Sequence, residues 1–347
     1  MRPLTFQGVI WRCGVLAVIL FIVVVVALKL GAVPVSLYGL GLDLLHVLLR
    51  KTSELSSNYN MIVYDIRLPR ILLAIVVGAS LAVAGTSFQA LLRNPLADPF
   101  VLGVSSGASL GAILTLIAVP YLAIPLAFAA LVTPVGAFLG AAATVAAVYF
   151  LGRREGQIDS NTLLLSGIVS ASFLSAIIMF LITTLSGRGD LRGMFFWLMG
   201  DLSGAIQPSL RWVLGIGFLV ATAVIYTTAS DLNLLLAGEK EAMHLGVDAR
   251  RVRLVVYIAA SVLTGLAVSV SGTIGYVGLL VPHVMRIIFG SDHRILIPTS
   301  ALGGAIVVVI ADTLARTVVA PSELPVGAMT ALAGAPLFLY LLRRKIA

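Results

Sequence analysis

Long apolar runs separated by short polar breaks dominate the sequence. A helix needs roughly 20 apolar residues to cross the hydrocarbon core of a bilayer, and lipid offers no partner to the polar groups of an open sheet edge. The pattern therefore predicts an all-α integral membrane protein of about ten helices, with one transmembrane domain over residues 1–347. The expected spans are 13–33, 68–90, 99–119, 123–151, 162–184, 209–229, 252–271, 274–289, 297–318 and 325–342.

The composition agrees with a membrane protein. Hydrophobic residues make up 60% of the chain and charged residues 11%, against roughly 25% charged residues in a soluble domain. The net charge of +8 comes from basic residues at the ends of apolar runs, a distribution typical of topology signals and not of a nucleic-acid surface. Cys13 is the single cysteine, which excludes an intramolecular disulfide and a cysteine metal cluster.

The polar breaks also predict an orientation. We expect the first span to stay as a helix and not to be cleaved as a signal peptide, with both termini in the cytoplasm. The longer segment 51–66 then lies outside. The breaks expected inside are 91–98, 152–161, 230–251 and 286–296.

Two segments share a rhythm of small residues, and each follows a basic break. They are ILLAIVVGASLAVAGTSF, from residue 71, and LVVYIAASVLTGLAVSVSGTIG, from residue 254. Repeats of opposite orientation are common in transporters, so the self-similarity predicts two inverted halves of five helices each.

Motifs of nucleotide hydrolysis and metal binding are missing. No glycine is followed by lysine, so the sequence contains no G-x-x-x-x-G-K-[ST] loop to bind phosphates. His283 and His293 favour a polar helix end over a metal site. An intramembrane transferase or protease would need polar groups at membrane depth, where only Asp312 and Arg316 qualify. We therefore expect no enzyme and no metal in this chain.

Several charged residues lie inside or beside apolar helices. Asp312 and Arg316 are four residues apart, and the cost of a charge in lipid predicts that they pair with each other, although Arg316 is also placed to face a partner. Arg67 and Arg70 begin the second span on one helix face. They fit either anchoring at the lipid headgroups or docking to carboxylates of an external protein.

The break RNPLADP, residues 93–99, contains two prolines. Pro95 and Pro99 lack backbone donors and push the preceding residues out of helical geometry, so this hairpin is predicted to be stiff. A stiff hairpin beside a conduit would make a good gate, whereas simple punctuation between spans would not need both prolines.

Small and amphipathic segments suggest further elements. Gly103, Gly107 and Gly111 recur every four residues, which favours tight helix packing, and a smooth wall along a conduit is compatible with it. Segment 188–204 predicts a short surface helix at the outer interface. Segment 231–253 predicts a short helix along the inner surface.

Taken together, seven segments resemble the FecCD-type permeases of ABC importers for iron-siderophore, haem and vitamin B12. The match runs in order from about residue 60 to the C-terminus. The segments are RLPRILLAIVVGASLAVAGTSFQALLRNPLADPFVLGVSSGASLGA, LLLSGIVSA, WLMGDLSG, LLLAGEKEAMHLGV, GYVGLLVPHVMRIIFGSDHRILIPTSALGGA, ADTLAR and ELPVGAMTALAGAPLFLYLL.

The resemblance implies a type II ABC importer permease. Such a permease forms a homodimer in the bacterial inner membrane, in contact with lipid, and works with two cytoplasmic ABC ATPases and a periplasmic or surface-tethered binding protein. ATP and Mg²⁺ are used by the ATPase, and this chain is expected to bind no cofactor and no nucleic acid. The implied substrate is a metal chelate, with ferric siderophore as the first choice, cobalamin or haem as alternatives, and ion-coupled secondary transport as a distant one.

The resemblance also assigns site residues. Binding-protein docking falls on Arg67, Arg70 and Arg316. The cytoplasmic gates fall on Asn94 and Leu96 and, through a variable loop, on Ser160 and Asn161. ATPase coupling falls in about 234–250, on Glu239, Ala242, Leu245, Gly246 and Val247, where Gly246 is placed to end a helix in the left-handed conformation.

Overall fold

A computed structural model describes residues 6–31, 61–121, 125–154, 157–185, 191–204 and 208–346. Within these ranges each predicted span coincides with one helix, and seven of the helices are long and apolar enough to cross a membrane. The helices are α1 (Phe6–Lys29), α4 (Leu68–Leu91), α5 (Val104–Ala118), α6 (Leu126–Leu151), α7 (Ser160–Leu185), α9 (Pro208–Thr227), α12 (Ala249–Ser271), α13 (Val277–Phe289), α14 (His293–Thr317) and α15 (Val326–Ile346). The apolar stretches of α5, α13 and α15 are shorter than the other seven. Most of the predicted outer segment 51–66 lies outside the described residues.

Short elements join the long helices. They are η1 (Met61–Arg67), η2 (Pro99–Leu102), η3 (Val119–Tyr121), α8 (Leu191–Leu198), α10 (Ala229–Ala237), α11 (Glu239–His244) and the antiparallel strands β1 (Arg153–Arg154) and β2 (Gln157–Ile158). The short helix predicted within 188–204 is confirmed as α8. The prediction of a single short helix in 231–253 is wrong. The chain turns at Gly238 and forms two short helices, α10 and α11, before α12 begins.

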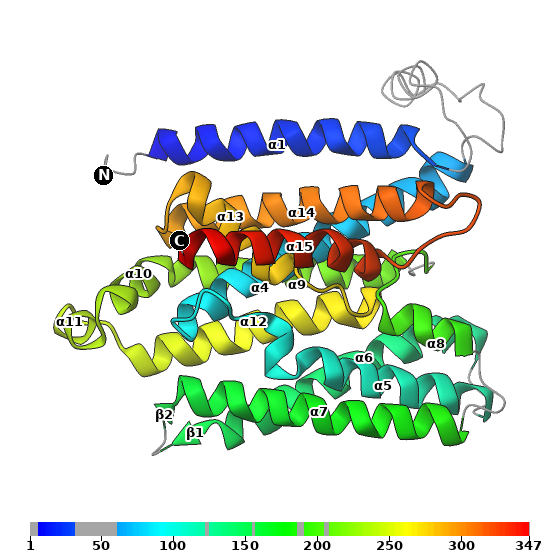
Figure 1. Cartoon of the computed structure of the whole chain (residues 1–347), viewed down its shortest axis with the longest axis horizontal. Coiled ribbons are helices and arrows are strands. Elements are labelled where there is room, and N and C mark those ends of the chain that lie inside the picture. Colours follow the sequence, from blue (N-terminus) through cyan, green and yellow to red (C-terminus); the bar gives the residue numbers. More distant parts are fainter. Residues whose placement is uncertain are drawn as a thin grey trace.

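Corresponding helices of the two halves run in opposite directions, as the inverted repeat predicts. Helix α4 and its counterpart α12 pack against each other and run in opposite directions in Figure 1. The next helix is short in both halves, with 15 residues in α5 and 13 in α13. The pattern of small residues thus identified the repeat correctly.

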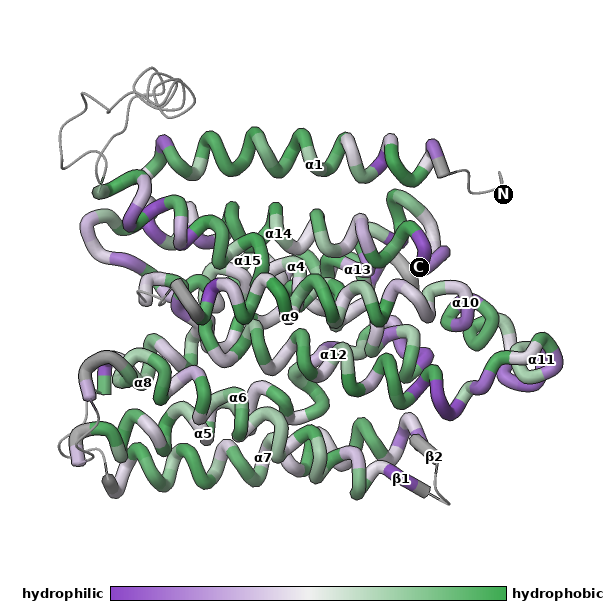
Figure 2. The backbone as a smooth tube through the Cα atoms, turned by 180° about the vertical axis from the view of Figure 1, so that it is seen from behind, coloured by the Kyte–Doolittle hydropathy of each residue, from purple (hydrophilic) through white to green (hydrophobic). Residues whose placement is uncertain are grey.

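The two ends of the bundle differ in their connections. At one end, which we call the α11 end, lie α10, α11, the β1–β2 hairpin and both chain termini (Figure 1). The other end, the α8 end, carries η1 and α8. Figure 2 shows the polar residues concentrated at the ends, with apolar residues along most of each long helix between them. All the breaks predicted on one side of the membrane thus lie at the same end.

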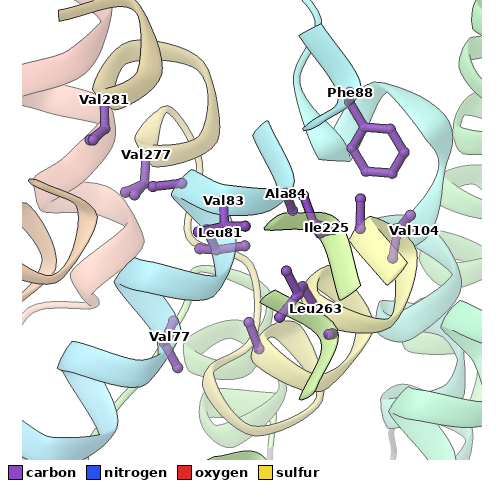
Figure 3. Packing of buried hydrophobic residues seen from close by; sticks show 14 of the residues in the cluster. Val77, Leu81, Val83, Ala84, Phe88, Val104, Ile225, Leu263, Val277 and Val281 are labelled. Atoms are coloured by element: carbon purple, nitrogen blue, oxygen red, sulfur yellow. The ribbon is translucent and has the colours of Figure 1, made fainter. Parts of the chain in front are cut away.

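Helix α4 forms the centre of the core. Figure 3 shows Val77, Leu81 and Phe88 of α4 among side chains from α12 and α13. Glycines allow this close approach, since a Cβ on Gly78 would lie 2.2 Å from the carbonyl oxygen of Gly304 in α14. Small residues at helix contacts are the usual device where lipid removes the hydrophobic drive between helices.

The predicted glycine face of α5 packs tightly. A Cβ on Gly107 would lie 2.5 Å from the carbonyl oxygen of Gly140, and one on Gly111 would lie 2.1 Å from that of Gly136, both in α6. Gly103 instead precedes the helix with a left-handed φ of 77°. A groove of about 630 Å³ follows Gly107 and Gly111, so tight packing is confirmed and the conduit wall stays a prediction.

Candidate functional sites at the two ends of the bundle

Four charged residues meet at the α8 end, and we call them the Asp312 cluster: Arg70, Asp312, Arg316 and Glu323. The Asp312 carboxylate accepts from Arg70 Nε at 2.8 Å and from Arg316 Nε at 3.0 Å. Arg70 Nη1 also donates to Glu323 Oε2 at 2.8 Å. The predicted pairing of Asp312 with Arg316 is confirmed, and Arg70 adds a link between α4 and α14.

Three members of the Asp312 cluster are buried, and the cluster as a whole is formally neutral. The side chains of Arg70, Asp312 and Arg316 are 8%, 1% and 7% exposed, whereas Glu323 is 42% exposed. Two positive and two negative groups balance one another, which is the arrangement that allows charges to persist within apolar surroundings. Removing one member would leave the others uncompensated.

Arg67 and Arg316 also donate hydrogen bonds to carbonyls at the C-terminal end of α1. The last carbonyls of a helix have no partner within it. Arg67 Nη1 donates to the carbonyl of Leu28 at 2.7 Å, and Arg316 Nη2 donates to that of Ala27 at 3.4 Å. Arg67 and Arg316 therefore hold the C-terminal end of α1 against α4 and α14.

The structure thus brings together the three arginines predicted to dock a binding protein, but it buries them. Their docking role stays a prediction. Arg70 keeps one buried atom, Nη2, without a hydrogen-bond partner among the described residues, beside a small cavity of about 140 Å³ that Asp65, Ser203 and Arg211 also line. The most exposed member of the cluster is Glu323, which the sequence did not single out.

The hairpin between α4 and η2 is held by its own side chains. Asn94 Oδ1 accepts from the Leu96 amide, and Asp98 Oδ1 accepts from the Phe100 amide, both at 2.9 Å. Burial raises the pKa of Asp98 to about 6. Asn94 is half-buried and Leu96 is 44% exposed. These bonds fit the stiff hairpin expected from the two prolines, whereas its stiffness and the role of Asn94 and Leu96 as a gate stay predictions.

The other predicted gate lies at the start of α7. Ser160 is the first residue of the helix, and Asp159 before it accepts a hydrogen bond from the Thr162 amide at 2.8 Å. Ser160 is half-buried and Asn161 is exposed. Both gate segments lie at the α11 end, but the gating role of Ser160 and Asn161 also stays a prediction.

The five predicted coupling residues have different surroundings. Leu245 and Gly246 are exposed at the tip that follows α11, with Leu245 at 68%. Ala242 is fully buried, and Val247 packs against the main core. Glu239 is ion-paired with Arg253 at 2.7 Å. Only Leu245 and Gly246 therefore present an open surface to a partner.

Gly246 ends α11 as predicted, with a left-handed φ of 87°. The Gly246 amide donates to the carbonyl of Met243 and the Val247 amide to that of Ala242, each at 3.0 Å. This pair of bonds is the Schellman motif, which satisfies helix carbonyls that would otherwise lack partners. The tip is thus a fixed turn, on which Met243 is 54% exposed next to Leu245.

Arg93 links the hairpin to the coupling segment. Its Nη2 donates to the carbonyl of Leu235 in α10 at 2.9 Å and lies 3.6 Å from Glu239 Oε2 in α11. In the sequence, this arginine is simply the first residue of the RNPLADP break. Its positive φ of 50° is rare outside glycine and asparagine, and no sequence pattern would have indicated it.

Asn233 fixes α10 to the beginning of α14. Its Nδ2 donates to Asp292 Oδ1 at 2.8 Å, and its Oδ1 accepts from the His293 amide at 2.9 Å. The hydrogen bond from Arg294 lowers the pKa of Asp292 to about 2, so this carboxylate is ionised at neutral pH. No group of three metal-ligating side chains occurs in the parts of the chain that the structure covers.

The inverted halves, the buried charges and the exposed turn of the α11 end together define a multi-pass membrane permease. The sequence profile of the FecCD transport family matches residues 19–344. The chain is 45% identical to the cobalamin import permease BtuC of Halobacterium salinarum over 82% of this chain and 74% of that protein. It is 44% identical to the hemin transport permease HmuU of Yersinia pestis over 81% of this chain and 83% of that protein.

A solved structure gives the same fold. The structure of a metal-chelate type ABC transporter in an inward-facing conformation superposes with a TM-score of 0.81 and 29% identity, covering 96% of this chain and 98% of that one. The chain belongs to the FecCD transport family, whose members are permease subunits of ABC importers. The resemblance inferred from the seven segments is confirmed.

Proposed function

We propose that this chain is the membrane subunit of an ATP-driven importer that carries a metal chelate into the cytoplasm. It would act as a homodimer in the bacterial inner membrane, with two cytoplasmic ATPase subunits at the α11 end and a substrate-binding protein at the α8 end. The observation that supports this best is the exposed, Schellman-capped turn at Leu245 and Gly246, a rigid apolar projection suited to a groove in another protein.

The orientation follows from the same proposal. An ATPase must meet its ATP and Mg²⁺ in the cytoplasm, so the α11 end and both termini would be cytoplasmic. The α8 end would face the binding protein, whose carboxylates would meet the region of Arg67, Arg70 and Arg316. Because these arginines are engaged inside the chain, docking would begin from an existing set of hydrogen bonds and ion pairs and would have to exchange them.

For the substrate we propose a macrocyclic metal chelate, cobalamin or haem, as first candidate. Two relatives named for these substrates are 45% and 44% identical to this chain, which supports the class but does not separate the two. The ferric siderophore preferred from the sequence remains the alternative. A path lined by small and apolar residues fits any of these bulky molecules, so selection would rest largely with the binding protein.

The test is uptake into proteoliposomes that contain this chain with its co-purified ATPase and binding protein. Labelled cobalamin, haem and a ferric siderophore are compared with and without ATP. Uptake of one chelate only in the presence of ATP would support the proposal and identify the substrate. Equal uptake without ATPase would overturn it in favour of ion-coupled transport.

Docking has its own test, a pull-down of the binding protein by Arg67→Glu with Arg70→Glu. We expect weaker docking with unchanged ATPase assembly. The Arg70 change places a new carboxylate beside Asp312, so the same sample needs an unfolding measurement. Unchanged docking by a folded variant would contradict the assignment.

A further inference from the structure

The polar contacts between the 92–98 hairpin and the coupling helices are concentrated in one side chain. Among the described residues, there are two such contacts, and Arg93 makes both. Its guanidinium donates a hydrogen bond to the Leu235 carbonyl at 2.9 Å and lies 3.6 Å from Glu239 Oε2. Leu235 lies in the last turn of α10, where carbonyls lack helical partners, and Glu239 begins α11. One guanidinium therefore spans the junction of the two helices at Gly238.

The hairpin is anchored independently on its other side. Gln89, one turn before the hairpin, donates to the carbonyl of Leu279 in α13 at 3.2 Å and accepts from Arg286 at 3.0 Å. Pro99 packs against Gly278, where a Cβ would lie 2.8 Å from the proline Cδ. The residues on either side of the hairpin are thus fixed to α13, and the hairpin itself contacts α10 and α11 through Arg93.

The coupling helices have a second attachment, which does not involve the hairpin. Arg253 at the start of α12 donates to Glu239 Oε2 at 2.7 Å, and Asn233 binds Asp292 at 2.8 Å. A displacement of α10 and α11 therefore reaches α12 and α14 directly. Its polar contacts with the hairpin are those of Arg93.

The contact between Arg93 and Glu239 adds little to stability, which favours a role in conformational change. Arg93 and Glu239 are 42% and 34% exposed, and ion pairs as exposed as this one contribute little to stability. Yet Arg93 holds a left-handed φ of 50°, which is an unfavourable conformation for a residue with a Cβ. A strained backbone with a weak surface contact is more typical of a functional position than of a structural one.

We propose that Arg93 is the positioning residue through which the coupling helices α10 and α11 move the 92–98 hairpin. Movement of α11 by a partner at the Leu245–Gly246 turn pulls on Glu239 and Leu235, and the guanidinium carries that displacement to Asn94 and Leu96. The inference rests on the proposed function. It adds a residue that connects the ATPase-facing turn to the predicted gate.

The experiment compares the number of chelate molecules imported per ATP hydrolysed in proteoliposomes with ATPase and binding protein. Arg93→Gln should lower this ratio by at least about fivefold, the lower end of typical coupling between sites, while ATP hydrolysis continues. Glu239→Gln should lower it too, and the double variant should not fall below the lower of the single variants. Arg251→Gln is the control, because Arg251 has the same charge at the same end and makes no ion pair within the described residues.

A second measurement follows the hairpin itself. Cys13 is the only cysteine, so a Cys13→Ser background allows a single spin label at Leu96→Cys, which is 44% exposed. With Arg93 present, the label's mobility should change when ATP is added to the complex. With Arg93→Gln, it should stay unchanged even though the ATPase still binds ATP.

The outcomes separate the two proposals. If the native chain shows no ATP-dependent uptake, the proposed function fails, and the role of Arg93 fails with it. If the native chain couples uptake to ATP and Arg93→Gln does so with the same ratio and the same label response, only the inference about Arg93 is overturned. An unfolding temperature equal to that of the native chain shows that a low ratio does not result from misfolding.

Discussion

The Asp312 cluster and the Arg93–Glu239 contact are both built from arginines and carboxylates, but their surroundings differ. At the α8 end, Arg70, Asp312 and Arg316 are at most 8% exposed. At the α11 end, Arg93 is 42% exposed. Breaking a buried pair leaves an uncompensated charge and costs about 3–5 kcal/mol, whereas an exposed pair contributes about 0.2–1 kcal/mol. The first therefore holds helices together, and the second can break and re-form within a transport cycle.

The largest expected effect is at Asp312. Asp312→Asn would remove the shared negative charge of Arg70 and Arg316 and should lower the free energy of unfolding by about 3–5 kcal/mol. Denaturant titration of the purified protein in detergent measures this. Asp231→Asn is the control, because Asp231 makes no ion pair within the described parts of the chain. Equal stability of the two variants would contradict the structural role of the cluster.

The next largest loss of stability is expected where α4 packs against α14. In Gly78→Ala the new Cβ would lie 2.2 Å from the backbone oxygen of Gly304, so the helices must separate, at a typical cost of about 1–3 kcal/mol. Gly215→Ala in α9 has no atom within 4 Å of its Cβ and should be neutral or slightly stabilising. The same titration compares them, and a tolerant Gly78 would mean that the two helices are not packed this closely.

A substitution at Gly246 changes the backbone of the turn at the α11 end without disturbing side-chain packing. No atom lies within 4 Å of a Cβ at this position, so the cost of Gly246→Val comes from its φ of 87°, about 1–3 kcal/mol for such strain. We expect the turn to rearrange and ATP hydrolysis to continue without uptake. The measurement is the ratio of uptake to hydrolysis, with Gly215→Ala as control. Normal uptake would count against the coupling assignment.

The smallest change in stability is expected for the exposed ion pair of Arg93 and Glu239. Arg93→Gln should lower the free energy of unfolding by at most about 2 kcal/mol, because it loses one exposed ion pair and one hydrogen bond to the Leu235 carbonyl, and this is less than the loss expected for Asp312→Asn. Titration of both variants in the same detergent gives the comparison directly. A loss as large as that of Asp312→Asn would show that Arg93 is structural and would remove the difference between the two ends.

The hairpin should also respond to pH through Asp98. Because burial raises the folded-state pKa to about 6 from 3.8, the protonated acid is favoured in the folded hairpin. The resulting stability is complete below pH 3.8 and is lost as pH rises through 6. Hydrogen exchange at residues 94–98 should show more opening at pH 7 than at pH 5, relative to Asp98→Asn. An equal response in that variant would exclude Asp98 as the cause.

Sequence reasoning succeeded where a single periodic or chemical constraint decides the outcome. Lipid forces helices, so each predicted span coincides with a helix, and seven of these helices are long and apolar enough to cross a membrane. The cost of a buried charge forces pairing, so the partner of Asp312 was found at Arg316. Gly246 was identified as a helix end because glycine adopts left-handed geometry at little cost.

The remaining contacts depend on distances between segments far apart in the chain. Arg70 reaches Asp312 across 242 positions, and Asn233 reaches His293 across 60. Glu323 and Arg93 each looked like residues of an ordinary break. Only the packing of α4 against α14 and of α10 beside the hairpin reveals what they contact. The division of the coupling segment into α10 and α11 likewise follows from tertiary contacts and not from its amphipathic pattern.

Helix α14 carries a contact at each of its ends. Its first residues meet Asn233 of the coupling segment, and Asp312, near its last turn, meets Arg70. At about 1.5 Å per residue, the 20 positions from Asp292 to Asp312 span about 30 Å, so a tilt of about 5° moves one end by about 2.6 Å relative to the other. Such a shift exceeds the tolerance of an ion pair. Movement of α14 as one body would therefore link binding at one face of the membrane to the ion pairs at the opposite face.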